Sequence, residues 1–139
     1  MTVQDPDVVT TGGVESAAAD SPRVGQLGLI ARNPAEGVTV VSVSGEVDML
    51  TAPQLRADVL GRLDASDVVV LDMSGVSFLG SAGLAVLVEA SQQAKRRDAS
   101  FRVVAVERAV TRPLAATGLG EVFSVFESVE LALEARTAL

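Results

Sequence analysis

The chain has 139 residues, a length typical of one compact domain. Apolar residues make up 48% of it but aromatic residues only 3%, so a core must be built from Val, Leu and Ala. Acidic side chains outnumber basic ones by 18 to 11, which disfavours nucleic-acid binding, and the lack of Cys and His excludes thiol nucleophiles, disulfides, Ser-His-Asp triads and ordinary zinc sites.

Residues 1–23 are rich in Asp, Ser, Thr, Gly and Ala and have no sustained apolar periodicity. Such a segment buries little surface, so we expect a flexible N-terminal leader followed by one domain over residues 24–139. The N-terminus is acidic where a signal peptide is basic, and no apolar run approaches the ~20 residues of a spanning helix. We therefore expect a cytoplasmic protein without a membrane segment.

The domain opens with two strands that we expect to form a hairpin. Apolar residues alternate from Leu27 to Ala31, and residues 33–37 supply turn chemistry. A β-branched run then covers residues 38–43 and ends at Gly45.

A helix is predicted next. Thr51 can act as its N-cap, with Pro53 in the first turn. Asp58 and Arg62 can pair at i,i+4 on the solvent side. Apolar side chains recur at helical spacing: Leu55, Val59 and Leu63.

Residues 68–71 are apolar at every position, which is typical of a strand covered on both faces. A turn-rich segment, residues 72–77, leads to a second helix that begins near Ser81 and ends in the basic residues 95–97. The stripe predicted for the core side of this helix is Leu84, Leu87, Val88, Ser91 and Ala94.

The C-terminal part alternates in the same way. Residues 101–106 predict a strand, Thr111-Arg112-Pro113 opens a short helix that Gly118 closes, and residues 123–126 suggest an edge strand. Ser128 can cap a last helix, whose apolar face is Val129, Ala132, Leu133 and Arg136.

The predicted order is therefore β-β-α-β-α-β-α-(β)-α. Strands that alternate with helices predict an α/β fold, and the opening hairpin makes its central sheet mixed. We expect about four to five strands and four helices.

Three carboxylates are candidates for chemistry. Glu46 and Asp48 lie two residues apart after a strand and could face one way, as an acid–base pair or metal ligands do. We favour solvated loop charges instead. Asp72 ends a buried strand, but no second Asp follows two residues later and no phosphate-binding loop is present. A magnesium-dependent carboxylate enzyme is thus a disfavoured alternative.

Ser81 lies between Gly80 and Gly83 where a strand gives way to a helix. Its hydroxyl can act as a plain N-cap, with the glycines easing the turn. The alternative is phosphorylation, because a phosphate there meets backbone N–H donors and the positive end of the helix dipole. No His exists to activate this serine as a nucleophile.

Three stretches together resemble the anti-sigma factor antagonists, which are members of the STAS domain family. The first is residues 43–55 (VSGEVDMLTAPQL), similar to the family's strand and entry into its first helix. The second is residues 70–84 (VLDMSGVSFLGSAGL), similar to the strand, loop and helix start around the family's serine motif. The third is residues 114–119 (LAATGL), which precede Val122 and Phe123.

The resemblance implies a STAS fold and a non-enzymatic protein that needs no cofactor or metal. Its partners would be an anti-sigma factor that is also a GHKL-type serine kinase, and a serine phosphatase. Binding the anti-sigma factor frees a sigma factor, and phosphorylation of the motif serine blocks that binding. By position the phosphoacceptor is Ser81, and the expected partner-binding residues are Glu46, Asp48, Thr51, Gly80, Ser81, Ala82 and Gly83.

Gly80 departs from the most familiar family members, which have Asp at this position. A second interpretation therefore stays open. In it the chain is a STAS interaction module of a larger signalling or lipid-transport assembly and has no phosphoswitch.

Overall fold

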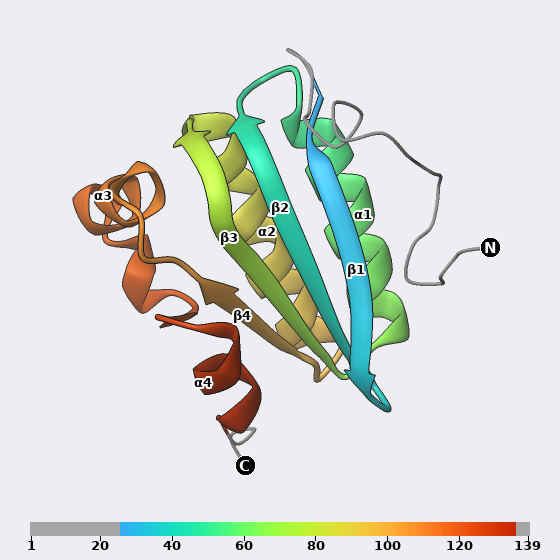
Figure 1. Cartoon of the computed structure of the whole chain (residues 1–139). Helices are drawn as coiled ribbons and strands as arrows, with labels where there is room; N and C mark the ends of the chain where they lie inside the picture. The colour runs from blue at the N-terminus through green and yellow to red at the C-terminus, as the bar shows by residue number, and fades with distance from the viewer. Residues whose placement is uncertain (1–25, 136–139) are drawn as a thin grey trace, which may run out of the picture.

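The computed structural model describes residues 26–135 and confirms the predicted α/β fold with a mixed central sheet. The expected leader, residues 1–23, and Arg136 lie outside the described residues. The sheet order is β1-β2-β3-β4-β5, with β1 antiparallel to β2 and all other neighbours parallel (Figure 1). The elements are β1 (Gly28–Ala35), β2 (Val38–Val47), α1 (Ala52–Ala65), β3 (Val68–Leu79), α2 (Ser81–Arg96), β4 (Ser100–Val104), α3 (Arg108–Thr117), the 3-10 turn η2 (Leu119–Glu121), β5 (Ser124–Phe126) and α4 (Val129–Glu134).

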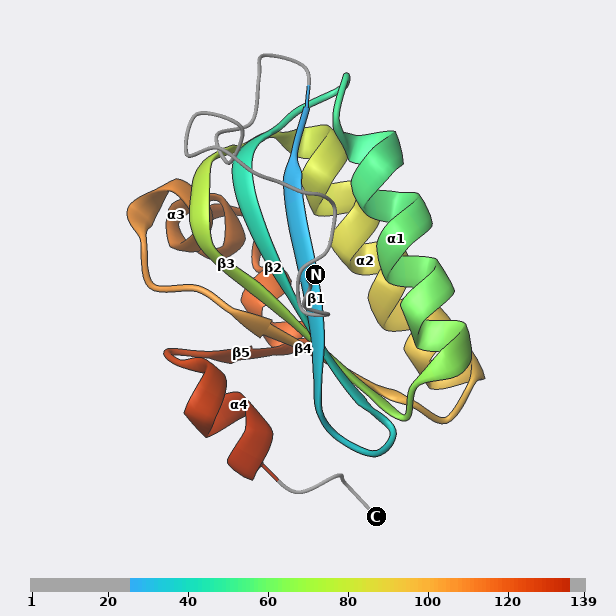
Figure 2. The same cartoon turned by 45° about the vertical axis from the view of Figure 1, so that its right-hand side comes forward.

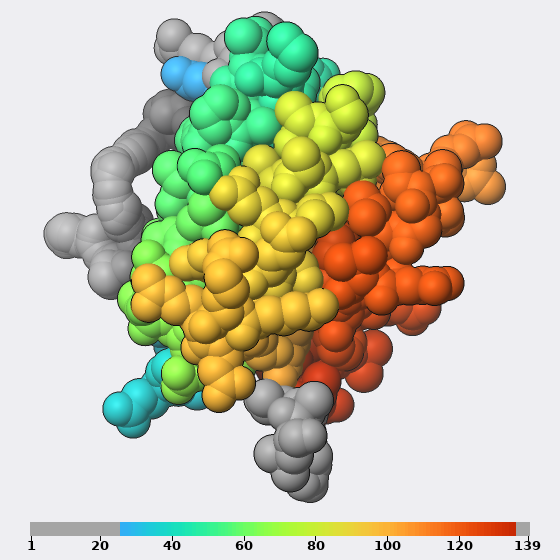
Figure 3. Space-filling model, turned by 180° about the vertical axis from the view of Figure 1, so that it is seen from behind, coloured from blue at the N-terminus to red at the C-terminus, as the bar shows by residue number. Residues whose placement is uncertain are grey.

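Helices α1 and α2 lie side by side over one face of the sheet, and seen from behind they cover much of it (Figures 2 and 3). The predicted stripe of α1 is confirmed, since Leu55, Val59 and Leu63 are all buried. The stripe of α2 is rotated from the prediction, because Leu84 and Val88 are only half-buried. The buried residues of α2 are Gly83, Val86, Leu87, Ala90, Ser91 and Ala94.

Helix α4 packs on the opposite face and closes a smaller core. Its N-cap is Ser128, as predicted, whose Oγ accepts a hydrogen bond from Leu131 N at 3.1 Å. Near its end, the buried Arg102 of β4 donates from Nη1 to Ala132 O at 2.6 Å. Desolvation lowers the pKa of Arg102 from its ordinary value. The buried residues of this core are Val40, Val70, Val104 and Ala132.

Strands β2 and β3 are longer than predicted. Residues 72–77 are not a turn: β3 continues through them to Leu79, paired with β2. The register between the two strands shifts twice, between Ser42 and Ser44 and between Gly45 and Glu46 of β2. At each shift β3 has one more residue than β2, as in a β-bulge. The prediction was wrong because Ser, Gly and Asp, which favour turns, occur here at bulges of a paired strand.

Helix α3 begins at Arg108, three residues earlier than predicted, so Pro113 lies inside it rather than in its first turn. Proline removes one helical hydrogen bond, but the buried Val110 and Leu114 hold the helix against the core. Gly118 closes the helix in the left-handed conformation (φ 73°), as predicted. Within residues 26–135 no helix is both long and apolar enough to span a bilayer.

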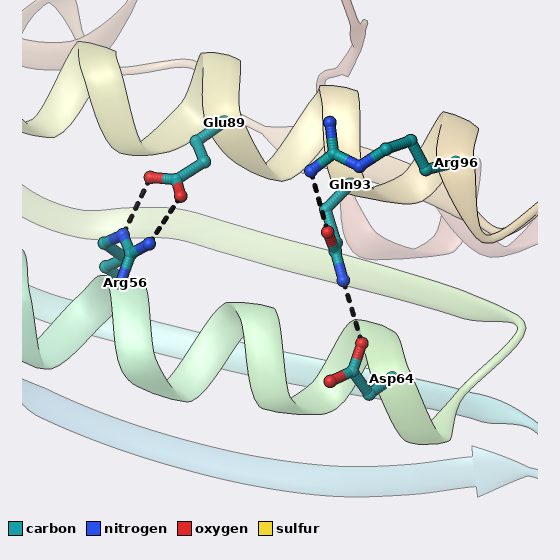
Figure 4. Close-up of polar contacts among 5 residues, drawn as sticks. All are labelled: Arg56, Asp64, Glu89, Gln93 and Arg96. Carbon is teal, nitrogen blue, oxygen red and sulfur yellow. Dashed lines mark hydrogen bonds and ion pairs between the residues drawn. The ribbon is translucent and has the colours of Figure 1, made fainter.

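Polar side chains join α1 to α2 on their solvent side (Figure 4). Arg56 donates from Nε and Nη2 to the two carboxylate oxygens of Glu89, at 2.8 and 2.6 Å. This pairing raises the pKa of Arg56 and lowers that of Glu89. One turn from the helix end, Gln93 donates to Asp64 Oδ1 at 2.9 Å and accepts from Arg96 Nη2 at 2.8 Å. These contacts are exposed, so they add little to the packing of the buried side chains between the helices and the sheet.

Candidate functional site

The carboxyl ends of β2 and β3 lie next to each other, and α1 and α2 both begin there (top of Figure 1). A backbone hydrogen bond from Gly80 N to Val47 O, 2.9 Å long, joins the two connections. The end of β2, the loop after it and the start of α2 therefore lie together at this edge of the sheet. The residues that the resemblance singled out are all here, although Thr51 and Gly83 are buried.

The loop between β2 and α1 is held by a network that we call the Asp48–Thr51 brace, defined by the side chains of these two residues. Asp48 Oδ1 accepts hydrogen bonds from Leu50 N at 2.9 Å and Thr51 N at 3.1 Å. Thr51 Oγ1 accepts from Asp48 N at 2.9 Å and donates to Glu46 O at 2.8 Å. Thr51 stands at the N-cap position, as predicted, but its hydroxyl holds the loop instead of capping α1.

The surroundings of Glu46 and Asp48 differ. Glu46 lies within β2 and is exposed, whereas the carboxylate of Asp48 accepts amides of its own loop. Asp72 lies inside β3, not at its end, and its Oδ1 accepts from Ser74 N at 3.0 Å. Among residues 26–135, no three acidic side chains gather in a way that could hold a metal ion.

Ser81 is the first residue of α2 and is exposed. The N-cap is Gly80, with extended backbone, so the prediction that Ser81 takes the N-cap role was wrong. Its hydroxyl makes no hydrogen bond to any other residue of the described part of the chain. Gly83 N and Leu84 N make the first helical bonds, to Gly80 O, and the N–H groups of Ser81 and Ala82 precede them.

The two glycines around Ser81 have different surroundings. A Cβ added to Gly83 would lie 2.5 Å from Val47 Cγ1 and 2.6 Å from Leu79 Cδ1, so this buried glycine lets α2 approach the sheet. It can serve a partner surface only by positioning α2. A Cβ on Gly80 would meet the ring of Phe78 at 3.1 Å. The backbone of Gly80 has a φ of −93°, which suits any residue.

Sequence reasoning missed the apolar part of this surface. Met49 and Leu50 in the loop after β2 are 81% and 73% exposed, and Phe78, which pairs with Glu46 across the strands, is 51% exposed. The available signal was two consecutive large apolar residues between polar ones just before a helix.

Comparisons with known proteins agree on the family. Residues 31–132 match the family model of the STAS domain. The chain is 36% identical over 99 residues to the anti-sigma-F factor antagonist RsfB of Mycobacterium tuberculosis, covering 70% of this chain and 80% of that protein.

Solved structures give the same result. An anti-sigma factor antagonist from Mycobacterium paratuberculosis has a TM-score of 0.73 at 35% identity, covering 81% of this chain and 96% of that one. Unphosphorylated SpoIIAA, an anti-sigma factor antagonist, shares the fold, with a TM-score of 0.65 at 16% identity and coverage of 76% and 93%. With the mixed sheet and four helices of residues 26–135 and this match over most of its length, the chain belongs to the STAS domain family.

Proposed function

We propose that this chain is an anti-sigma factor antagonist that acts in the cytoplasm and binds an anti-sigma factor through the surface around Ser81. The names of its relatives support the class of function. The observation that carries the assignment of the site is Ser81 itself: an exposed serine at the first position of α2, with its hydroxyl unbonded within residues 26–135. The anti-sigma factor in this proposal is a GHKL-type kinase that phosphorylates Ser81, and a serine phosphatase reverses the reaction.

A phosphate on Ser81 would change the surface without changing the fold. It adds about 1.5–2 negative charges at one point. The positive end of the α2 dipole and the N–H groups of Ser81 and Ala82 can accommodate that charge. The effect is therefore expected at the interface, through repulsion and steric block.

The direct test uses the purified anti-sigma factors of the source organism, with the anti-sigma-F factor of Mycobacterium tuberculosis as a further probe. At least one should bind the chain in calorimetry, and with ATP it should add phosphate at Ser81, located by mass spectrometry. Ser81→Ala should abolish the modification, whereas Ser77→Ala, which removes another exposed hydroxyl nearby, should not.

The outcomes separate the parts of the proposal. Binding by none of these proteins contradicts the antagonist function. Binding without phosphorylation by an active kinase favours an interaction module without a phosphoswitch, the alternative that Gly80 leaves open. Phosphate on Ser74 or Ser77 would show that the acceptor is assigned to the wrong serine.

A substitution that mimics the charge should separate binding from folding. Ser81→Asp is expected to weaken binding of the anti-sigma factor strongly. Its free energy of unfolding should change little, because a negative charge at a helix N-terminus is favourable by about 0.3–1 kcal/mol. Titration calorimetry and thermal unfolding measure the two effects, and a variant that fails to bind because it is unfolded would contradict this mechanism.

A further inference from the structure

We propose, on the basis of the function proposed above, that Met49 and Leu50 form the main apolar contact with the anti-sigma factor and enter an apolar pocket on its surface. Asp48 and Thr51 then act as positioning residues that hold the loop. This assignment reverses the expectation from sequence, in which the polar residues of this loop recognise the partner.

Met49 and Leu50 are unusually exposed for large apolar side chains. Single apolar residues on a surface are common and need no explanation. Here two consecutive large side chains are 81% and 73% exposed, and they lie within one short loop. Removing them from water on binding is favourable in proportion to their apolar area.

The Asp48–Thr51 brace makes this exposure a fixed feature of the loop. The Asp48 carboxylate and the Thr51 hydroxyl bond to the backbone before and after Met49, and Thr51 is only 2% exposed. Within residues 26–135, the Thr51 hydroxyl and Oδ1 of Asp48 are used in the loop, whereas the half-buried Asp48 makes no hydrogen bond through Oδ2. A loop that is already ordered loses less conformational entropy on binding, which favours affinity.

The position of the loop connects it to Ser81. Val47 O, one residue before the brace, accepts the hydrogen bond of Gly80 N, one residue before Ser81. Phe78, half-exposed, is also next to Gly80. The apolar side chains and the proposed phosphoacceptor therefore belong to one continuous surface. Burial of an apolar contact beside a phosphate would also require desolvation of the phosphate, which is costly.

The charges at this edge indicate the surroundings of the pocket. The exposed Glu46 lies within β2 just before the loop, and the chain as a whole carries a formal charge of −7. A complementary partner surface has an apolar pocket with cationic side chains at its rim. The anti-sigma factor is the occupant to which this inference commits.

The test is a binding comparison with a matched control. Met49→Ser combined with Leu50→Ser should weaken binding to the anti-sigma factor about tenfold or more, equally at low and high salt. Ile30→Ser removes an apolar side chain of similar exposure (70%) from β1 and should leave the dissociation constant within about twofold. Both variants should unfold at the temperature of the parent.

A second pair tests the positioning role. Thr51→Val removes the hydroxyl but keeps the shape, and should weaken binding and speed exchange of the Leu50 amide hydrogen. Thr51→Ser keeps the hydroxyl, so its affinity for the anti-sigma factor and its rate of Leu50 amide exchange should be those of the parent.

Each outcome is decisive. If the double variant binds as tightly as the parent, the inference is wrong. The proposed function is still supported in that case, provided that the parent binds the anti-sigma factor and Ser81→Asp abolishes the binding. If the parent binds no anti-sigma factor, the proposed function is wrong, and so is this inference, which rests on it. If the double variant melts lower, Met49→Gln and Leu50→Gln are measured singly, and unchanged affinity in both overturns the inference.

Discussion

Gly83 and Gly61 lie in the two helices that cover the same face of the sheet, and the space around them differs. A Cβ on Gly83 would overlap Val47 and Leu79, whereas a Cβ on Gly61 in the middle of α1 would meet no atom within 4 Å. Neither glycine has a positive φ, so the difference is one of packing alone.

This contrast predicts opposite effects of the same substitution. Gly83→Ala should lower the free energy of unfolding by about 1–3 kcal/mol, because the added methyl overfills the contact between α2 and the sheet. Gly61→Ala should raise it by about 0.5–1 kcal/mol, because alanine favours the helix and nothing opposes it. Urea unfolding of the two variants measures both, and a Gly83→Ala protein as stable as the parent would contradict the packing argument.

Helix α2 links the core to the proposed switch at the scale of the element. It presents Ser81 at its first turn and buries Leu87 completely below it. The periodicity of the sequence placed Leu84 and Leu87 on one stripe, but only Leu87 is fully buried, since Leu84 lies at the margin of the core.

The same substitution at these two leucines should therefore differ in cost. Leu87→Ala should lower the free energy of unfolding by about 2–5 kcal/mol, through lost burial and the cavity left behind. Leu84→Ala should lower the free energy of unfolding by distinctly less, because Leu84 is only half-buried. Denaturant unfolding compares them directly, and equal losses would support the stripe inferred from sequence over the structure.

Local patterns predicted the order and type of the elements but not the ends of the long strands. Gly118 and Ser128 end α3 and cap α4 as predicted, because caps depend on neighbouring residues. Thr51 stands at the start of α1 as predicted, but its hydroxyl does not cap the helix. The composition of residues 72–77 predicts a turn, whereas their strand conformation depends on pairing with β2, which is distant in sequence. At the candidate site, the sequence predicted an exposed Ser81 at the start of a helix, which the structure has. It did not predict that Asp48 and Thr51 bond within their own loop, because this depends on the loop conformation.

The described part of the molecule, residues 26–135, is organised around two cores on opposite faces of one sheet, both formed by residues between Leu27 and Ala132. The STAS match, residues 31–132, spans almost the same part of the chain. We propose on this basis that residues 24–139 form the domain and that residues 1–23 contribute nothing to its stability.

Deletion of residues 1–23 tests this boundary. The shortened chain should keep the free energy of unfolding and the affinity for the anti-sigma factor of the full chain, because the leader has no periodic apolar face to bury. Urea unfolding and calorimetry compare the two chains. A loss of several kcal/mol would show that the leader packs on the domain.

The Asp48–Thr51 brace has a consequence for how such proteins can diverge. The hydrogen bonds of the brace join the side chains of Asp48 and Thr51 to backbone atoms of Glu46, Asp48, Leu50 and Thr51. None of them uses the side chain of Met49 or Leu50. Those two positions can therefore change identity while the loop keeps its form. A duplicated gene could acquire a new binding preference by exchanging two adjacent codons, with no repair needed elsewhere in the fold. Parallel signalling pathways in one cell could be insulated from each other in this way.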